Sequence, residues 1–144
     1  MTPPLPNLIP ELDVADLAAA VEVYRNVLGF ALAYERPDEA FAMLTRPGVA
    51  IMLQASAGPG RRFRTAPLER PFGRGVNFQI AVADLDVVYA AVRARGLSTP
   101  IPLEERSYRV DGEDRLQRQF VVADLDGYLL RFCAHSTQSS PIPR

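Results

Sequence analysis

Two side-chain types that often carry out catalysis, cysteine and histidine, are scarce in this sequence. The chain has one cysteine and one histidine, Cys133 and His135, which lie close together near its C-terminal end. A cysteine needs a neighbouring base or positive charge to become a good nucleophile, and nothing in the sequence places His135 in that role. Glu11 is the best candidate for a general base, because it is predicted to stand on the open face of a strand. If the protein is an enzyme, we expect Glu11 to be its catalytic carboxylate.

Arginine is concentrated in one segment, residues 56–75, which is also rich in Gly and Pro and has Glu69 as its only acidic residue. This composition is typical of a long surface loop. We interpret the positive excess as a solvated, flexible face, with gating of a nearby cleft or attraction of anions as the alternative. The arginines of the segment are Arg61, Arg62, Arg64, Arg70 and Arg74.

A repeated pattern of predicted strands and helices would position the candidate side chains. The tetrapeptide VADL begins at Val14, Val82 and Val122. Before Val14 and before Val82, apolar and polar residues alternate, as in a strand with one buried face. After both, apolar residues recur at helical spacing, and Asp16 and Asp84 are suited to cap the helix N-termini. The first two copies therefore predict two strand-to-helix units.

The residues that follow the third VADL copy have a different pattern. Asp126-Gly127 and a second apolar run follow it at once, which is the pattern of a β-hairpin. Its likeness to the other two copies is accidental in this interpretation. The two predicted helices end at Gly29 and Gly96, which suit the left-handed conformation of a helix C-terminus. Their predicted apolar stripes are Leu17, Val21, Tyr24 and Leu28 in the first helix and Leu85, Val88, Tyr89 and Val92 in the second.

Three further strands follow each predicted helix, so both halves have the order β-α-β-β-β. The expected fold class is α+β, with two tandem modules forming curved mixed sheets with outer helices. The predicted strands after the helices cover residues 30–35, 40–45, 49–55, 102–110, 117–123 and 128–133. Within a single domain of residues 1–144, module 1 is expected at about 5–55, the loop at 56–75, module 2 at about 76–134 and a loose tail at 135–144.

The composition of the chain excludes several classes of protein. A formal net charge of −1 provides no overall field to attract nucleic acid or a membrane surface. No apolar run approaches the ~20 residues of a membrane span, and the N-terminus lacks the regions of a signal peptide. A cytoplasmic protein is the default expectation. The open sheet edges of the predicted fold favour a homodimer.

The order of these motifs resembles the vicinal oxygen chelate superfamily, which includes glyoxalase I, extradiol dioxygenases, and fosfomycin- and bleomycin-resistance proteins. Three features carry the resemblance: VYRNVLGF at residues 23–30, DLDGYLLRF at residues 124–132, and the strand-to-helix hinges at Val14 and Val82. The resemblance implies the tandem β-α-β-β-β fold. It also implies up to four metal positions, on the first and last strands of each module.

In this chain the implied metal positions are occupied by poor ligands. They are Ile9, Met52, Asn77 and Arg131, with Gln54 in place of Met52 if the strand register slips by two residues. Zn²⁺ or Fe²⁺ at a catalytic site needs about three nitrogen or oxygen ligands with lone pairs. Ile has none, and the guanidinium of Arg131 offers only donors and a positive charge. We therefore expect no metal and no cofactor.

Among the branches of the superfamily, the chain is most similar to the metal-free bleomycin-resistance proteins. The features in common are PNLIP at residues 6–10, IMLQASAGPG at residues 51–60 and the LLRF ending. This likeness implies a homodimer that sequesters a small molecule, an antibiotic among the candidates, in a cleft. The alternatives are a lyase, isomerase or dioxygenase with atypical or no metal ligands, and a protein-interaction module.

Strand alternation assigns the residues that would line such a cleft. Arg131 would pair with an anionic or carbonyl-bearing ligand, or else form an internal ion pair with Glu11. Phe41 and Met43 would join Met52 in an apolar floor, or else belong to the ordinary core. The expected ligand-binding residues are Ile9, Glu11, Phe41, Met52, Gln54, Asn77, Gln79, Tyr108 and Arg131.

Overall fold

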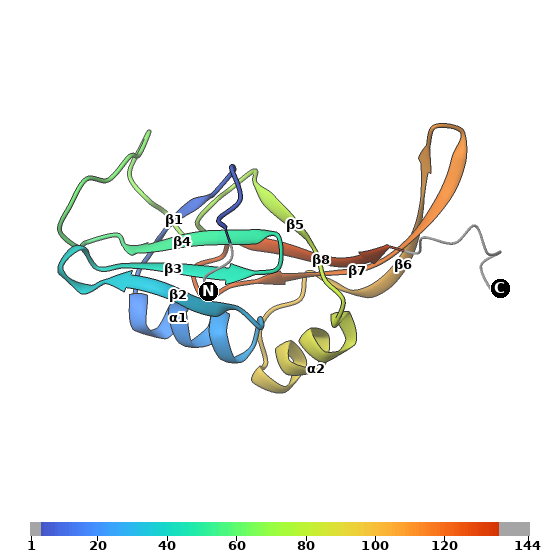
Figure 1. The fold of residues 1–144 in the computed structure, drawn as a ribbon, viewed down its shortest axis with the longest axis horizontal. Coiled ribbons are helices and arrows are strands. Elements are labelled where there is room, and N and C mark those ends of the chain that lie inside the picture. Colours follow the sequence, from blue (N-terminus) through green and yellow to red (C-terminus); the bar gives the residue numbers. More distant parts are fainter. Residues whose placement is uncertain (1–3, 136–144) are drawn as a thin grey trace. The chain divides into compact units, whose positions relative to one another are not determined.

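The structure, a computed structural model, describes residues 4–135 of the chain (Figure 1). It divides into two compact units, unit 1 over residues 1–72 and unit 2 over residues 73–144. In the described residues, each unit has one α-helix and one four-stranded sheet. The predicted α+β fold of two β-α-β-β-β modules is therefore confirmed. The predicted loose tail lies outside the described residues from residue 136 onward.

Unit 1 has the strand order β1-β4-β3-β2. Strand β1 pairs in parallel with β4, and the other pairs are antiparallel. The edge position of β1 suits Pro10, which cannot donate to a sheet and whose carbonyl accepts a hydrogen bond from Met52 N at 2.9 Å. The elements are β1 (Glu11–Val14), α1 (Leu17–Asn26), β2 (Ala31–Arg36), the 3₁₀ helix η1 (Pro37–Glu39), β3 (Phe41–Arg46) and β4 (Val49–Ala55).

Unit 2 repeats this topology with the strand order β5-β8-β7-β6, again with one parallel pair, β5 with β8. Asp111 and Gly112 between β6 and β7 both have positive φ, 52° and 80°, as a tight hairpin turn requires. The elements are β5 (Asn77–Ala81), α2 (Leu85–Arg95), β6 (Ile101–Val110), β7 (Glu113–Ala123) and β8 (Leu129–His135).

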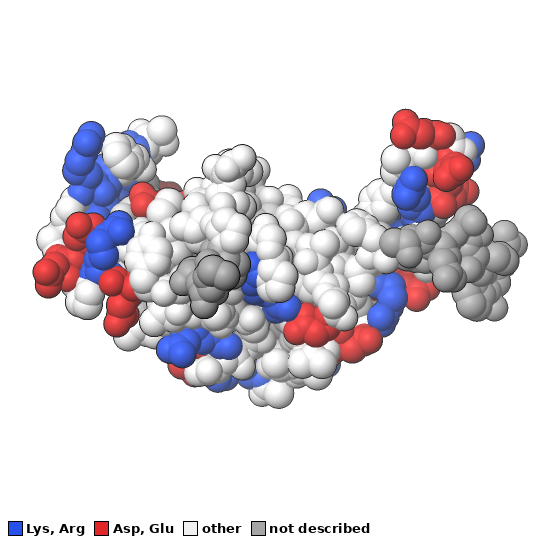
Figure 2. All heavy atoms as spheres, in the orientation of Figure 1, with Lys and Arg blue, Asp and Glu red and all other residues white. Residues whose placement is uncertain are grey.

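Strands β6 and β7 continue beyond the rest of their sheet as a two-stranded arm, residues 107–116, drawn in orange in Figure 1. The last residue of β7 that pairs with β8 is Gln117, opposite His135. The arm is exposed and strongly charged near its turn (Figure 2), where Arg109 and Asp114 form an ion pair of 3.3 Å. Its base forms one side of a cavity in unit 2, described below.

Helix α1 packs against β2, β3 and β4, but its predicted apolar stripe is partly wrong. The buried residues of the helix are Ala20, Val23 and Tyr24, whereas Leu17 and Val21 are only half-buried. Leu17 and Val21 instead line an open groove of about 630 Å³ beside β2. Both faces of α1 carry apolar residues, so helical spacing alone could not determine which face is buried. In α2, Leu85, Val88 and Val92 are buried as predicted, and Tyr89 is half-buried.

Strand β1 is also shorter than the alternating sequence pattern predicted. Strand β1 starts at Glu11, and Leu8, which alternation placed on the buried face, is 84% exposed. Alternation extends the pattern to residue 7, yet strand β4 provides partners only from Met52 to Ala55. A strand ends where its partner no longer offers hydrogen bonds, which the sequence of one strand does not reveal.

The aspartates of the three VADL copies differ in their contacts. Asp16 caps α1 by accepting a hydrogen bond from Ala19 N at 3.0 Å. Asp84 precedes α2 but makes no capping hydrogen bond with its side chain, so that part of the prediction is wrong. Asp124 is 7% exposed, and one of its oxygens accepts hydrogen bonds from the N–H groups of Asp126, Gly127 and Tyr128, at 2.9–3.0 Å. These bonds hold the predicted β7–β8 hairpin.

We expect Asp124→Ala to destabilise the protein more than Asp16→Ala. Removing Asp124 leaves three buried or half-buried N–H groups without their charged acceptor, a loss of about 3 kcal/mol. Removing the exposed cap of α1 should cost about 1 kcal/mol. Urea denaturation followed by circular dichroism would measure both, with Asp16→Asn as a control that retains a capping oxygen. Equal losses for the two alanine variants would contradict this account of the hairpin.

Candidate functional site

The open face of the unit 1 sheet has an apolar centre. Glu11 is opposite Met52, and Met52 is opposite Met43, so these three side chains form one row across β1, β4 and β3. Phe41, Met43 and Ala50 are buried in one cluster, against which Ile9, Ala33 and Met52 pack. Phe41 and Met43, which the sequence assigned either to a cleft floor or to the ordinary core, are therefore buried residues in contact with Met52. These are side chains that alternation placed on the face away from α1.

Phe41 is less accessible than a cleft residue would be. It is 4% exposed, and the Arg36 guanidinium lies 4.0 Å from its ring centroid. Arg36 is held there by an ion pair of 3.0 Å with Glu39. Glu11, by contrast, is exposed at the start of β1, next to apolar neighbours. Within unit 1, the described residues give Glu11 no hydrogen-bonding partner of the kind that positions a catalytic carboxylate.

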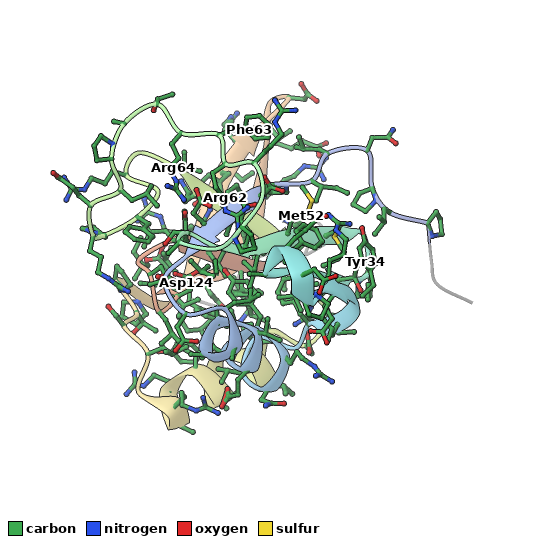
Figure 3. The ribbon with its side chains drawn as sticks, turned by 90° about the vertical axis from the view of Figure 1, so that its left-hand side faces the viewer. Tyr34, Met52, Arg62, Phe63, Arg64 and Asp124 are labelled. Carbon is green, nitrogen blue, oxygen red and sulfur yellow. The ribbon has the colours of Figure 1, made fainter. Side chains whose placement is uncertain are left out.

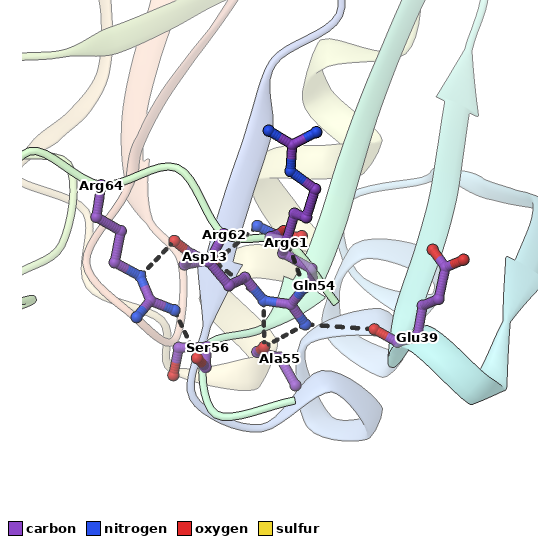
Figure 4. A network of polar contacts seen from close by, with 8 residues as sticks. All are labelled: Asp13, Glu39, Gln54, Ala55, Ser56, Arg61, Arg62 and Arg64. Atoms are coloured by element: carbon purple, nitrogen blue, oxygen red, sulfur yellow. Dashed lines mark hydrogen bonds and ion pairs between the residues drawn. The ribbon is translucent and has the colours of Figure 1, made fainter. Parts of the chain in front are cut away.

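The same sheet also carries a buried polar pair, Asp13 and Gln54, whose polar groups are bonded to other side chains (Figure 4). Asp13 is 7% exposed and lies opposite Gln54. Its carboxylate accepts a hydrogen bond from Gln54 Nε2 at 2.8 Å and one from Arg64 Nε at 3.0 Å. Arg62 Nε forms an ion pair with it at 3.8 Å. Gln54, predicted to bind a ligand, is thus 5% exposed and donates to Asp13 instead.

The arginine-rich loop is anchored at residues 62 and 64, contrary to the prediction of a solvated, flexible face. The side chain of Arg62 is 11% exposed and donates to the carbonyl oxygens of Ala55, at 2.8 and 3.0 Å, and Glu39, at 3.3 Å. Arg64 donates to the carbonyl of Ser56. A buried carboxylate requires compensating charges, and the loop provides them from far along the chain. Charge composition alone did not distinguish these arginines from solvated ones.

Between and beside the two anchors, Arg61 and Phe63 are exposed. Phe63 is 72% exposed, and the Arg61 guanidinium lies 5.2 Å from its ring centroid. Figure 3 shows Arg62 and Arg64 over the sheet of unit 1, with Met52 on the same side. Anchored and exposed side chains therefore alternate along residues 61–64.

The open face of the unit 2 sheet is polar where that of unit 1 is apolar. Gln79 lies opposite Arg131, and Gln119 lies opposite both Cys133 and Glu104. Gln117 and Gln119 are buried, at 7% and 3% exposed. Two adjacent strands, β7 and β8, therefore place amides, a guanidinium and a thiol on one surface.

A chain of hydrogen bonds connects the amides of this face. Gln119 Nε2 donates to Glu104 Oε1 and to the hydroxyl oxygen of Tyr108, both at 3.0 Å. Gln117 Nε2 donates to Gln119 Oε1 at 2.7 Å and approaches Gln79 Oε1 at 3.5 Å. The chain therefore extends from Glu104 on β6 to Gln79 on β5.

Next to this network is a cavity of about 370 Å³, a volume within the range of small-molecule sites. The Nε of Arg131 is buried and has no hydrogen-bond partner within residues 4–135. A buried donor without an acceptor costs about 1–3 kcal/mol, so Arg131 has an unused hydrogen-bond donor beside the cavity. The lining residues are Gln79, Tyr108, Val110, Arg115, Leu116, Gln117, Arg131 and His135.

Cys133 and His135 lie two residues apart on β8 but do not form an activated pair. Cys133 is fully buried, with its sulfur 3.8 Å from His135 Nε2. Burial raises the pKa of the Cys133 thiol, and the positive charge of Arg131 opposes that rise. A raised pKa keeps the thiol protonated and weakens it as a nucleophile.

The residues at the implied metal positions do not fit a metal ion. Ile9 packs against the apolar cluster of unit 1 with Met52, Asn77 is exposed at the start of β5, and Arg131 carries a guanidinium. A hydrocarbon, a thioether, an amide and a cation are not a donor set for Zn²⁺ or Fe²⁺. Nowhere in residues 4–135 do three or more His, Cys, Asp or Glu residues gather as metal ligands would.

Of the predicted ligand-binding residues, the structure brings two groups together. In unit 2, Gln79, Tyr108 and Arg131 line one cavity, while Asn77 is not part of its lining. In unit 1, Ile9, Phe41 and Met52 meet in the apolar cluster, with Glu11 beside Met52 and Gln54 engaged by Asp13. Sequence reasoning missed Glu104, Arg115, Gln117 and Gln119. A signal was present in the Gln-Arg-Gln spacing of residues 117–119, which places two amides on one strand face.

The fold of this chain recurs among solved structures. TioX from Micromonospora sp. ML1 is 24% identical, with a TM-score of 0.68, over 90% of this chain and 98% of TioX. The genomically encoded fosfomycin resistance protein FosX from Listeria monocytogenes is 20% identical, with a TM-score of 0.61, over 96% of this chain and 97% of FosX. A superfamily member from Vibrio splendidus 12B01 is 38% identical over 88% of this chain and 95% of its own, with a TM-score of 0.42. The first two likenesses define the class of fold.

The family follows from the sequence. The family model described as the Glyoxalase/Bleomycin resistance protein/Dioxygenase superfamily matches residues 10–132. The chain belongs to this superfamily, as the hinge and hairpin motifs indicated. None of the curated proteins compared with the chain matches it.

We expect Arg62→Gln to release the loop of unit 1, whereas Arg61→Gln should leave it in place. Arg62 contributes part-buried bonds to the Ala55 carbonyl, an exposed one to the Glu39 carbonyl and an ion pair with Asp13, together about 2–3 kcal/mol. Arg61 is exposed. Chymotrypsin should then cut after Phe63 about tenfold faster or more in the Arg62 variant, with the cut site identified by mass spectrometry. Equal cleavage rates in the two variants would show that Arg62 does not anchor the loop.

Cys133 should react slowly with iodoacetamide at pH 8. Because burial raises its pKa, less of the thiol is in the thiolate form at this pH, and the sulfur is also inaccessible. We expect a rate about tenfold or more below that of glutathione, and full reaction in urea. Arg131→Met should slow the reaction further, because it removes the charge that lowers the pKa. A rate equal to that of glutathione in the folded protein would contradict this account.

Proposed function

We propose that this chain is a metal-independent small-molecule-binding protein of the superfamily, which holds its ligand on the open face of the unit 2 sheet and sequesters it. The observation that carries the proposal is the position of Arg131. It stands where the resemblance implies a metal ligand, lines a cavity of about 370 Å³ and has a buried Nε with no partner in the described residues. A guanidinium at this position repels cations and attracts acceptor groups of a ligand.

The proposal includes an antibiotic among the candidate ligands, in keeping with the bleomycin-resistance branch that the sequence resembles. FosX, a protein of the same fold, is described as a fosfomycin resistance protein. The apolar side chains Val110 and Leu116 of the arm give the cavity a surface for the body of an organic ligand.

The alternative of a lyase, isomerase or dioxygenase with atypical or no metal ligands rests on Glu11 as a general base. The surroundings of Glu11 in unit 1 are apolar, and its side chain is exposed. The ion pair between Glu11 and Arg131 that the sequence left open would join residues of the two units, and it stays a prediction. So does the cytoplasmic location; in the described residues, no helix is long and apolar enough to cross a membrane.

Arg131→Met should abolish ligand binding while leaving the fold intact. A panel of antibiotics and metabolites would be screened by thermal shift, since a ligand at 100 times its Kd stabilises a protein by about 2.7 kcal/mol. Compounds that stabilise the natural chain should not stabilise the Arg131 variant, and Arg93→Met, on exposed helix α2, should bind as the natural chain does. Stabilisation that survives Arg131→Met would place the ligand elsewhere.

Metal ions provide the second arm of this test. Zn²⁺, Ni²⁺, Mn²⁺ and Fe²⁺ should neither stabilise the protein nor remain bound after dialysis, because the side chains at the four implied positions do not form a ligand set. Stoichiometric metal, together with turnover of hemithioacetal or catechol substrates that Glu11→Gln abolishes, would favour the enzyme instead.

The proposal also includes a homodimer. Each sheet has two edge strands in its own unit, β1 and β2 in unit 1 and β5 and β6 in unit 2, and natural proteins protect such edges. Sedimentation equilibrium should therefore give twice the 15.9 kDa mass of the chain. A mass of one chain at micromolar concentration would contradict the dimer, and a protein that copurifies in stoichiometric amount would favour an interaction module.

A further inference from the structure

The hydrogen-bond chain on the open face of unit 2 has a direction, and Glu104 sets it. A carboxylate can only accept hydrogen bonds, so the group of Gln119 that faces Glu104 must be its amide NH₂, as the 3.0 Å contact from Nε2 shows. The other hydrogen of that NH₂ points to the Tyr108 hydroxyl oxygen, also at 3.0 Å. The carbonyl oxygen of Gln119 is then the only polar atom left on its side chain.

This orientation is passed on to the next two amides. Because Gln119 offers its carbonyl oxygen, Gln117 must present its NH₂, and the two atoms are 2.7 Å apart. The same NH₂ approaches Gln79 Oε1 at 3.5 Å, so Gln79 accepts with its oxygen and keeps its own NH₂ for other partners. Tyr108, which accepts from Gln119, likewise keeps its hydroxyl hydrogen. The direction set at Glu104 therefore ends in two donors at the cavity.

The cavity lining is consequently rich in donors and in positive charge. Arg131 lines the cavity, and its buried Nε has no partner among residues 4–135. Arg115 contributes a second guanidinium from the arm. Within the part of the chain that the structure describes, no Asp or Glu is part of this lining. Gln117 Oε1 remains as an acceptor. His135 can donate or accept a hydrogen bond at a given ring nitrogen, according to its tautomer. Donors with two fixed positive charges match the oxygens of an anion better than those of a neutral or cationic group.

We infer that the ligand of this cavity is a small organic anion, a carboxylate or phosphonate carried on an apolar body, and that Glu104 is a positioning residue that orients the Gln79 and Tyr108 donors toward it. The inference rests on the proposed binding function of the same cavity and adds the charge class of its ligand. The apolar body follows from Val110 and Leu116, which lie in the lining beside the polar groups. Glu104 does not line the cavity and acts through Gln119 and Gln117.

Pairs of compounds that differ in charge test the ligand class. Benzoate and phenylphosphonate would be titrated into the full-length ¹⁵N-labelled chain, alongside the neutral benzamide and methyl benzoate and inorganic phosphate without an apolar body. We expect the acids to shift the Arg131 Nε–H and Gln79 NH₂ resonances in a saturable way, at least about tenfold more tightly than the neutral compounds or phosphate, because charged hydrogen bonds to arginine are strong.

The outcomes separate the inference from the proposed function. Neutral compounds that bind in this cavity as tightly as the acids would overturn the anionic class and leave the binding function standing. Inorganic phosphate that binds as tightly as benzoate would contradict the claim that the ligand has an apolar body. If no compound of any class shifts these resonances, and none of a wider panel does, the binding function itself fails.

The positioning role of Glu104 is tested by whether benzoate affinity rises or falls when the residue is changed. Glu104→Gln removes a negative charge near an anion site, so Coulomb's law alone predicts tighter binding of benzoate. Loss of the fixed amide direction predicts the opposite, because a glutamine at this position can donate as well as accept. We expect benzoate affinity to fall about threefold or more. Unchanged or tighter binding would overturn the positioning role.

The neighbouring residue provides a matched control. Glu105→Gln removes the same charge one residue along β6, where Glu105 is exposed and forms an ion pair of 3.8 Å with Arg118. It should change benzoate affinity by less than about twofold, since its side chain has no part in the amide chain. A loss of affinity as large as that of the Glu104 variant would mean that the charge of β6, and not the direction of the amides, controls binding.

Discussion

The alternation of side chains along each strand is the constraint on which the rest of this structure depends. Because successive residues point to opposite sides of a sheet, every strand must divide its residues between a helix-covered face and an open one. In both units the covered face is apolar and fully buried, as at Leu53 and Leu44 in unit 1 and Phe120 and Phe132 in unit 2. The other face need not be uniformly apolar, and its residues differ in polarity between the two units.

The same sheet positions have acquired different chemistry in the two halves. Glu11 and Met52 are paired across β1 and β4, and Gln79 and Arg131 are paired in the same way across β5 and β8. In unit 1 the face is closed by packed Met and Phe residues and by two arginines that neutralise Asp13. In unit 2 the corresponding face has a cavity and a donor that has no partner among the described residues. A duplicated fold can thus retain its covered faces while the residues on its other two faces diverge.

Local patterns in the sequence were sufficient for the fold but not for the site. Alternation and helical spacing located the strands and helices, because they report which residues are buried in the nearest element. They failed where long-range partners decide the outcome. Arg62 and Arg64 were interpreted as solvated because the carboxylate that binds them, Asp13, is far away in the sequence. Gln117 and Gln119 were overlooked because their importance comes from Glu104, and strand register is not visible in one strand.

The three VADL copies illustrate how one chemical property serves two structures. After a strand, the next few N–H groups lose their sheet partners, and an aspartate can accept hydrogen bonds from them. Asp16 does so for the first turn of α1, and Asp124 does so for the β7–β8 hairpin. The third copy was interpreted as an accident because no helix follows it, yet its aspartate performs the same task with more bonds. The hairpin it holds leads directly into Arg131, so the residue that resembles a helix cap fixes the start of the strand that carries the candidate site.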